Sequence, residues 1–404
     1  MDKNGKVTTD NLFLFATLII FTVALNSDWS SSSIIWWGSV AFFACVFLYH
    51  SKAKLAYERK YTTWVVSFLI ICMLSIIWAA STTQVVSMMK SMIVNTAIIF
   101  LIRSCINSKE GVCRIINTLL IAITINAVYL LLLNKNALLS INSNVNSTAN
   151  RLGAGGTWNA NSIGIMMSIG FVFFLYYFRT EKKRITKIFY GFLTALMVFV
   201  ALVTGSRKAL LTVLIGAVTY FVLDSKGKRI RSILLIIVSL LAAAYLVLEV
   251  PYFYSIIGWR MEAMLAKYTG VGVVDHSSLV RDEFIKAGII VFKQHPIVGV
   301  GLDCFRIFNE KITGYRWYAH NNYVELLADL GLVGFTVYYL GHLYLLKEFI
   351  KNLKDNSSTT KIFFAIFVCV LINGYGAVTY NDFLFPTLLM LMYAWFTTEW
   401  DQEY

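Results

Sequence analysis

Long apolar stretches recur along the whole sequence, and they constrain the fold more than any other feature. A helix of about 17 to 25 apolar residues is long enough to cross the hydrocarbon of a bilayer. Of the 404 residues, 58% are hydrophobic and only 14% are charged, a balance outside the range of soluble domains. The stretches lack the short alternating pattern of membrane β-barrels. The sequence therefore predicts an all-α, polytopic membrane protein.

The apolar stretches predict about twelve transmembrane helices in a single integral membrane domain over residues 1–404. No small-residue cleavage site follows the first stretch, so we expect it to be a retained helix. Two connections stand out as external structure, a loop at 134–160 and a large loop at 250–320. The expected spans are 11–27, 33–49, 62–80, 84–102, 115–133, 161–178, 187–204, 208–224, 232–249, 321–346, 362–380 and 383–399.

Lysine and arginine gather in alternate connections, and this indicates the orientation of the chain. Cytoplasmic loops of membrane proteins are enriched in basic residues. The basic connections here are 51–60, 103–114, 179–187, 224–231 and 347–361. Both termini are therefore expected in the cytoplasm. The net charge of +13 fits this placement and contact with the lipid bilayer, so we exclude nucleic acid as a partner.

The large external loop carries its own helix signals. Residues 277–296 begin with serine, have acidic residues in the first turn and end at Pro296, which is typical of an amphipathic helix. We expect this helix to lie on the outer membrane surface. Residues 252–268 resemble it, and the glycines at 299 and 301 predict a tight turn. The expected apolar positions are Val280, Phe284, Ile285, Ile289 and Phe292.

Basic residues on the external side run against the orientation rule. Arg207 and Lys208 lie in a very short connection, where a neutral turn would suffice. One interpretation is that they extend to lipid phosphates; the other is that they bind an anionic ligand. Ser206 is placed to cap the following helix, Arg281 lies in the first turn of the external helix, and Arg151 precedes another helix. Arginines at helix N-termini suit phosphate groups.

His320 and Asn321 begin a further helix that also contains two carboxylates. An imidazole at a helix N-terminus near arginines favours its neutral form, which accepts a proton. The alternative is an interfacial residue of an aromatic belt. Glu325 and Asp329 share one face at i, i+4 spacing, and we expect them to turn inward and anchor the arginines rather than react.

Three motifs resemble one known family. "HNNYVELLADLGLVG" at 320–334 fits a pattern of His, Asn and a later Gly-x-x-Gly. "TGSRKALL" at 204–211 and "RDEFIKAGIIVFKQHPIVGVGLDCF" at 281–305 precede it in the family's order. The chain resembles the O-antigen ligase and Wzy polysaccharide polymerase family of bacterial envelope enzymes. The resemblance covers about 200–335; further toward the N-terminus only the topology and "RLGAGGTWNANSIG" at 151–164 agree.

The resemblance implies a GT-C-like glycosyltransferase of the bacterial cytoplasmic membrane that needs no metal and no cofactor. Its active site would face outward. Such enzymes transfer a glycan from undecaprenyl diphosphate to an acceptor sugar hydroxyl. By motif matching, Arg207 and Arg281 would hold the diphosphate and His320 would act on the acceptor hydroxyl. Residues expected to bind substrate are Arg151, Lys208, Asn321, Tyr323 and Glu325.

Several functions stay open from the sequence. A polymerase extends lipid-linked repeat units, whereas an O-antigen ligase moves the glycan to lipid A core or another acceptor. The richness in Lys, Asn and Ile resembles capsule loci of low-GC Gram-positive bacteria, which favours the polymerase, and a regulator of chain length is then a candidate partner. A flippase or transporter would place ionisable groups near the membrane midplane and show internal repeats, whereas here the charges gather at the external face.

Overall fold

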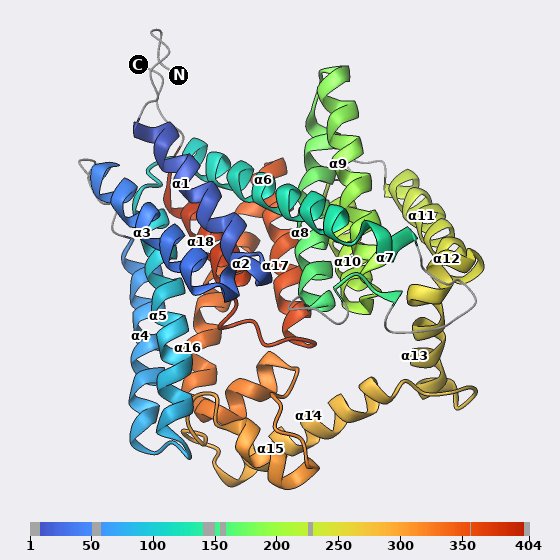
Figure 1. Cartoon of the computed structure of the whole chain (residues 1–404). Coiled ribbons are helices and arrows are strands. Elements are labelled where there is room, and N and C mark those ends of the chain that lie inside the picture. Colours follow the sequence, from blue (N-terminus) through green and yellow to red (C-terminus); the bar gives the residue numbers. More distant parts are fainter. Residues whose placement is uncertain are drawn as a thin grey trace. The chain divides into compact units, whose positions relative to one another are not determined.

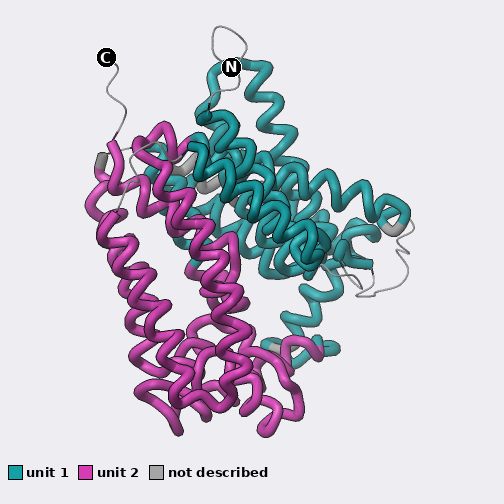
Figure 2. The backbone as a smooth tube through the Cα atoms, turned by 60° about the vertical axis from the view of Figure 1, so that its left-hand side comes forward, with its two compact units in different colours: residues 1–50, 114–275, 355–370 teal, residues 51–113, 276–354, 371–404 magenta. Residues whose placement is uncertain are grey.

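The computed structural model describes residues 9–50, 58–139, 150–153, 159–224, 229–355 and 357–399. These ranges are almost entirely helical, and the only pairing of extended backbone among them is an isolated bridge between Ser108 and Glu399. The chain divides into two compact units (Figure 2). The first contains residues 1–50, 114–275 and 355–370, and the second contains residues 51–113, 276–354 and 371–404.

The helices of the two units are labelled in Figure 1. The first unit holds α1 (Thr9–Ala24), α2 (Ser27–Ser31), α3 (Ser33–His50), most of α6 (Lys109–Leu133), α7 (Lys135–Leu139), α8 (Ala160–Thr180), α9 (Arg184–Val203), α10 (Arg207–Leu223), α11 (Arg229–Glu249), α12 (Pro251–Phe253), the π-helical turn η3 (Tyr254–Gly258), α13 (Trp259–Thr269) and most of α17 (Ser358–Gly374). The second unit holds α4 (Arg59–Leu74), η1 (Ser75–Ile77), α5 (Thr82–Ser104), α14 (His276–Gln294), α15 (Phe305–Thr313), α16 (Asn322–Asn352) and α18 (Leu384–Thr397), with η4 (Leu353–Asp355) at its boundary.

Helix α8 is the packing centre of the first unit, and its glycines explain why. A Cβ atom at Gly164 would lie 2.7 Å from the Cβ of Ala209 and 2.8 Å from Oγ1 of Thr204. A Cβ atom at Gly170 would lie 3.1 Å from Sδ of Met197. The absence of side chains at these positions lets α8 lie directly against α9 and the start of α10. Helix α8 therefore supports the connection between α9 and α10.

In the second unit, α16 packs against α4 through a tryptophan that lies on a glycine. A Cβ atom at Gly341 would lie 2.1 Å from the ring of Trp64. The indole Nε1 of Trp64 donates to the carbonyls of Val337 and Tyr338, at 3.1 and 3.0 Å. A buried cluster of apolar side chains extends from this contact to α14 and the loop before α15, and includes Phe68, Val291, Leu302, Phe305 and Leu326. This cluster fixes α14 against the N-terminal part of α16.

Each of the twelve expected spans overlaps one helix of the structure. Seven described helices are long and apolar enough to cross a membrane, namely α3, α4 with η1, α5, α6, α8, α9 and α16. The helical segments Leu241–Glu249 and Pro251–Ala266 meet at a bend of 77° and could form one more broken span, while α1, α17 and α18 are apolar but shorter. The described residues are thus helical, as predicted, and their seven candidate spans are consistent with a polytopic membrane protein. The total of about twelve, the orientation and the GT-C-like arrangement stay predictions.

The large loop at 250–320 contains the expected helices, with two differences. Helix α14 begins at His276, so Arg281 lies in its second turn rather than its first. Its buried face is formed by Phe284, Ala287, Gly288 and Val291, whereas Ile289 is 41% exposed. Ala287 and Gly288 carry little hydrophobic signal, but their small size lets α14 approach α16 closely. In the loop at 134–160, α7 is described, and residues 140–149 and 154–158, with much of the "GAGG" segment, lie outside the described part.

Candidate active site

The connection between α9 and α10 is a tight turn at residues 204–206. Gly205 has a φ of +58°, a left-handed conformation that glycine adopts without a steric penalty. Ser206 is the N-cap of α10, and its Oγ accepts from the backbone N–H of Ala209. The predicted cap is therefore confirmed. The turn also orients Arg207, the first residue of α10, as it leaves the helix N-terminus.

Three arginines surround this turn, and we call the group the arginine turn: residues 204–206 with Arg151, Arg207 and Arg260. Nε of Arg151 donates to the carbonyl of Thr204 at 2.8 Å. One guanidinium nitrogen of Arg260 donates to the carbonyl of Gly205 at 2.8 Å. Arg207 donates to the carbonyl of Arg260 at 3.4 Å. Two predicted site residues, Arg151 and Arg207, are thus brought to one turn of the chain.

Two polar side chains complete the arginine turn. Asp275 forms an ion pair with Arg207, with 2.6 Å between the two charged groups. Oδ1 of Asn161, near the start of α8, accepts from Arg151 at 3.3 Å and from Oγ of Ser206 at 3.0 Å. Lys208 is partly buried as the second residue of α10. The turn therefore gathers several cationic side chains beside the N-terminus of a helix, an arrangement that suits an anionic group.

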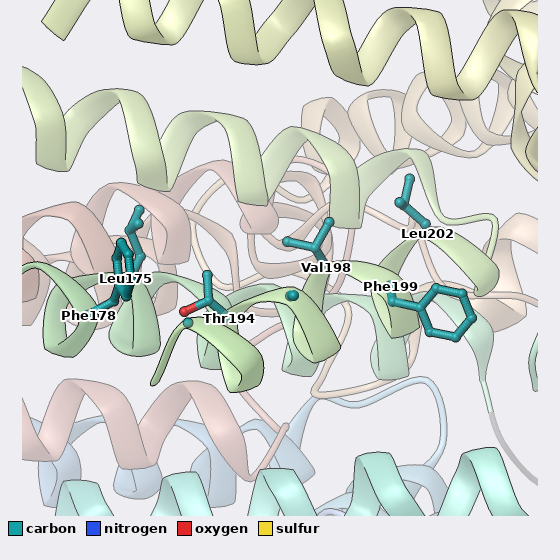
Figure 3. Close-up of a pocket in the computed structure, with 8 residues that line it drawn as sticks. Leu175, Phe178, Thr194, Val198, Phe199 and Leu202 are labelled. Atoms are coloured by element: carbon teal, nitrogen blue, oxygen red, sulfur yellow. The ribbon is translucent and has the colours of Figure 1, made fainter. Parts of the chain in front are cut away.

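An apolar groove lies along α8 and α9 in the same unit (Figure 3). Its volume is about 450 Å³. The groove ends on the last turn of α9 at Leu202, whose carbonyl accepts from the N–H of Gly205 in the arginine turn. The residues that line it are Leu175, Phe178, Gly191, Thr194, Ala195, Val198, Phe199 and Leu202. The end of the apolar groove therefore lies one main-chain hydrogen bond from the turn that gathers the cationic side chains.

In the second unit, His320 stands immediately before α16 in an unusual backbone conformation. Its φ is +54°, and it is one of two non-glycine residues with positive φ in the described part of the chain. Such conformations cost on the order of 1–3 kcal/mol and persist where the surroundings fix them. The N-cap Asn321 fixes the next residue, because its Oδ1 accepts from the N–H groups of Tyr323 and Val324. The backbone conformation of His320, together with its side-chain rotamer, thus sets the orientation of the imidazole ring.

Aromatic rings contact the His320 imidazole. The ring of Phe284, on α14, stacks on it with centroids 6.1 Å apart and an interplanar angle of 11°. The ring of Tyr318 lies closer, with centroids 4.1 Å apart. Helix α14 approaches because Gly288 has no side chain: a Cβ atom there would lie 2.3 Å from Cγ1 of Val324. We call the region of Arg281, Phe284, Tyr318 and His320 the α14–α16 junction.

Arg281 belongs to this junction as well. It lies three residues before Phe284 on α14 and therefore on the same helix face. Burial raises the pKa of the Tyr318 hydroxyl, and the nearby Arg281 guanidinium acts in the opposite direction. Arg281 is thus within electrostatic range of Tyr318, whose ring contacts His320. Two residues of the predicted catalytic set, Arg281 and His320, are thus gathered in one unit.

The carboxylates of α16 bind main-chain N–H groups. Glu325, 1% exposed, accepts from the N–H of Ala319 at 2.5 Å. Asp329, 0% exposed, accepts from the N–H groups of Asp303 and Phe305 at 2.8 and 2.7 Å. The expected inward orientation is confirmed. Their hydrogen bonds hold the segments before α15 and α16, whereas the ion pair of Arg207 is made by Asp275, which the sequence did not point to.

The glycines of the family-like motifs form one interlocked contact. Helix α16 is broken at Gly331, where φ is 61° and ψ is −163°. The N–H groups of Leu332 and Val333, beyond the break, donate to the carbonyls of Pro296 and Ile297. A Cβ atom at Gly331 would lie 2.3 Å from the oxygen of Ile297, and one at Gly299 would lie 2.3 Å from the oxygen of Asp329. The expected tight turn thus packs its backbone against the broken helix.

Two substrate-binding candidates are engaged within the second unit. The hydroxyl of Tyr323 donates to the carbonyl of Leu371 at 2.8 Å, and its ring stacks on Tyr339 with centroids 5.1 Å apart. Asn321 is 3% exposed and caps α16. Both contacts stabilise the helix start beneath His320. Contact of either residue with substrate stays a prediction, as it does for Arg151, Lys208 and Glu325.

An additional charged pair lies beside Asp329. Arg306 forms an ion pair with Asp303, the other non-glycine residue with positive φ. Burial acts to lower the pKa of Arg306, but the neighbouring carboxylates, Asp303 above all, raise it beyond its usual value. Burial raises the pKa of Asp303, while Arg306 opposes the shift. In the described part of the chain, no group of three or more His, Cys, Asp or Glu side chains is placed to hold a metal ion.

Two residues at the arginine turn, Arg260 and Asp275, were not predicted from the sequence. Arg260 and Asp275 lie in the large loop that was expected to be external, and Arg260 is only 5% exposed. A basic residue on the external side was the criterion that singled out Arg207. Applied to residues 252–268, the same criterion would have identified Arg260. Asp275 has no comparable signal, because a loop carboxylate is ordinary.

Comparison with known proteins completes the description of these sites. The family model described as O-antigen ligase (Wzy_C) matches residues 192–339, a little over a third of the chain. No curated protein matches the sequence. The matched segment begins in α9 and ends in α16, so it includes Arg207, Arg260, Arg281 and His320. Members of this family are membrane glycosyltransferase-like enzymes. Residues 192–339 are thus similar to the O-antigen ligase family, and the match supports the resemblance carried by the sequence motifs.

Proposed function

We propose that this protein is an oligosaccharide repeat-unit polymerase of the bacterial cytoplasmic membrane. It takes a glycan from undecaprenyl diphosphate and joins it to a sugar hydroxyl of another lipid-linked repeat unit, on the external side and without a metal. The observation that carries the proposal is that the apolar groove ends at Leu202, whose carbonyl accepts from the N–H of Gly205 in the arginine turn. A ligand with a prenyl chain and a diphosphate head matches both properties, because arginine forms charge-assisted hydrogen bonds to phosphate oxygens.

The proposed chemistry is a single displacement. The acceptor hydroxyl oxygen attacks the anomeric carbon, a new carbon–oxygen bond forms, and the bond from that carbon to the diphosphate oxygen breaks. The hydroxyl proton passes to His320 acting as general base. The diphosphate leaves with the bonding electron pair, and the arginines stabilise the charge that develops on it. One displacement inverts the anomeric centre, and a leaving group that is already a stable anion needs no general acid.

The α14–α16 junction supports the role of His320. Its backbone is held by the Asn321 cap, its ring contacts Tyr318 and Phe284, and Arg281 lies on the same helix face as Phe284. A general base has to be held in a defined orientation to reach its proton. The strained φ of +54° is a further mark of a site where function outweighs stability.

An O-antigen ligase is the second candidate, and the description of the matching family favours it. The two reactions share the donor and differ in the acceptor. The deciding experiment uses the full-length protein, purified in detergent, with lipid-linked repeat units and no membrane gradient. A ladder of longer lipid-linked glycans supports the polymerase. Transfer only to an added lipid A core acceptor supports the ligase, and no product with either acceptor overturns both.

The groove can be tested separately from the chemistry. Ala195→Trp would fill the groove from an exposed position on α9, whereas Ile185→Trp, on the same helix but outside the groove, is the matched control. We expect Ala195→Trp to raise the KM for a long-chain prenyl donor about tenfold or more, because it displaces several buried isoprene carbons. The KM for a short-chain donor should stay the same. An equal effect on both donors would show that the prenyl chain lies elsewhere.

A further inference from the structure

Arg260 is the most deeply buried residue of the arginine turn's three arginines, and its position is unusual for a charged side chain. It is 5% exposed and is the second residue of α13, directly after the π-helical turn η3. Charged side chains are rarely buried to this extent unless their hydrogen-bonding groups are engaged. We therefore consider which groups of the arginine turn Arg260 holds in place.

Both the side chain and the main chain of Arg260 contact the arginine turn. The guanidinium donates to the carbonyl of Gly205 at 2.8 Å, and its own carbonyl accepts from Arg207 at 3.4 Å. The second guanidinium nitrogen of Arg207 is held by Asp275. Arg207 is thus fixed at two points, one of which is the backbone of Arg260.

The turn is packed closely on two sides, and the hydrogen bond from Arg260 is its third support. A Cβ atom at Gly205 would lie 2.9 Å from Cγ of Arg151 and 2.9 Å from the oxygen of Ile256, which belongs to η3. The turn is therefore enclosed by Arg151 on one side and by η3 on the other. In η3, a Cβ atom at Gly258 would lie 2.3 Å from the oxygen of Val247, so α11 also limits movement of this segment.

We infer that Arg260 is a positioning residue that holds the 204–206 turn and, through it, directs Arg207 toward a diphosphate ligand. The inference rests on the proposed function, because it takes Arg207 as a ligand of the diphosphate. It assigns Arg260 no contact with the reacting atoms. The hydrogen bond to Gly205, rather than the charge alone, is the means by which Arg260 acts.

The test measures binding of inorganic pyrophosphate to the full-length protein in detergent by titration calorimetry. Arg260→Met removes the donor, Arg260→Gln keeps a neutral donor, and Arg260→Lys keeps a charged one. We expect Arg260→Met to weaken binding about tenfold or more, in line with the loss of a hydrogen bond from a charged group in a buried site. Arg260→Gln and Arg260→Lys should each recover most of the affinity. Arg179→Met is the control, since Arg179 pairs with Asp224 at the far end of α8.

A double-mutant cycle distinguishes positioning from an independent contribution. In the Arg207→Met background, Arg260→Met should change pyrophosphate affinity by less than about twofold, because coupled residues are not additive. Additive losses, or an Arg260→Gln variant as weak as Arg260→Met, would show a direct electrostatic role and overturn the inference. Lack of pyrophosphate binding by the unaltered protein would also overturn it. The product ladder is a separate readout, so a protein that binds pyrophosphate but forms no glycan contradicts only the proposed function.

Discussion

The arginine turn and the α14–α16 junction use buried charge in opposite ways. At the turn, cationic side chains donate to backbone carbonyls, and one loop carboxylate, Asp275, pairs with Arg207. Next to the junction, on α16, the carboxylates of Glu325 and Asp329 accept from backbone N–H groups. The side chain of Arg207 keeps 12% of its surface exposed, whereas Asp329 keeps none. The charge of Arg207 thus stays partly exposed, whereas the two carboxylates of α16 are enclosed among main-chain donors.

The largest effect should come from the glycine break in α16. Gly331 has a φ of 61° and a ψ of −163°, a conformation that alanine adopts only with strain. In Gly331→Ala, the added Cβ atom would also lie 2.3 Å from the oxygen of Ile297. We expect a loss of stability of about 3 kcal/mol or more, with little folded protein recovered from the membrane. Size-exclusion chromatography and thermal unfolding in detergent measure this.

Gly314→Ala separates clash from backbone strain. Gly314 also has a positive φ, of 82°, but a Cβ atom added there would meet no atom within 4 Å. The loss of stability should then be about 1 kcal/mol. Equal stability of the two variants would show that the junction tolerates movement between α16 and the 296–301 segment.

Removing either predicted diphosphate ligand should abolish turnover with the fold retained. For Arg207→Ala and Arg281→Ala we expect product formation to fall by on the order of a hundredfold or more, because charge stabilisation of the leaving group is lost. The amount of protein in the membrane should stay at the level of Arg179→Met. If either variant kept an activity close to that of the unaltered protein, the arginine replaced in it would not be a ligand of the diphosphate.

His320→Ala should separate chemistry from donor binding. We expect kcat to fall by about 10² to 10⁴-fold, the usual contribution of a general base. Pyrophosphate binding, which we assign to the arginine turn, should stay within about twofold of the unaltered protein, since the proposed role of His320 is with the acceptor hydroxyl rather than with the diphosphate. Titration calorimetry and initial rates with lipid-linked repeat units measure the two quantities. Parallel losses would make His320 a ligand of the donor rather than a base.

The smallest effect concerns the pH dependence of stability at the junction. Burial raises the pKa of Asp303 above its usual value of 3.8, so the folded protein binds this proton more readily than the unfolded chain. Its contribution to stability is therefore greatest at low pH and is lost as the pH rises from 3.8 through the folded-state pKa. Asp303→Asn, a residue that tolerates positive φ, should remove this dependence in thermal unfolding scans across that range. An unchanged slope would mean that Arg306 fully compensates the burial.

Much of the fold was predictable because helix signals are local. The apolar stretches, the Ser206 cap and the start of α16 at Asn321 all follow from neighbouring residues in the sequence, and each corresponds to an observed element. The buried face of α14 was misplaced because Ala287 and Gly288 carry little hydrophobic signal, although they permit the closest approach to α16. A small residue is buried only if another helix packs against it, and the local sequence does not show which helix that is.

Candidate site residues could be predicted where a charged or polar side chain is unusual for its position in a membrane protein, and not where such a side chain is common. Arg207 and His320 stood out because a membrane protein has little reason to place them at helix starts that are expected to be external. The partners of these residues come from distant segments: Asp275 lies 68 residues after Arg207 in the chain. The break at Gly331 was equally hidden, since the sequence "LADLGLVGF" reads as a continuous apolar helix. Only the hydrogen bonds to Pro296 and Ile297, and the close approach of Ile297, reveal why a glycine stands at 331.

The break in α16 also answers how two carboxylates can occur in so apolar a helix. The helix has 31 residues, and at about 1.5 Å per residue it is roughly 46 Å long, well beyond the hydrocarbon thickness of about 30 Å. The part after Gly331 alone is roughly 32 Å long and is sufficient to cross the bilayer. The part before it, which carries Glu325 and Asp329, is then not needed to span the bilayer, and its two buried carboxylates are free to hold the main-chain N–H groups of neighbouring segments instead.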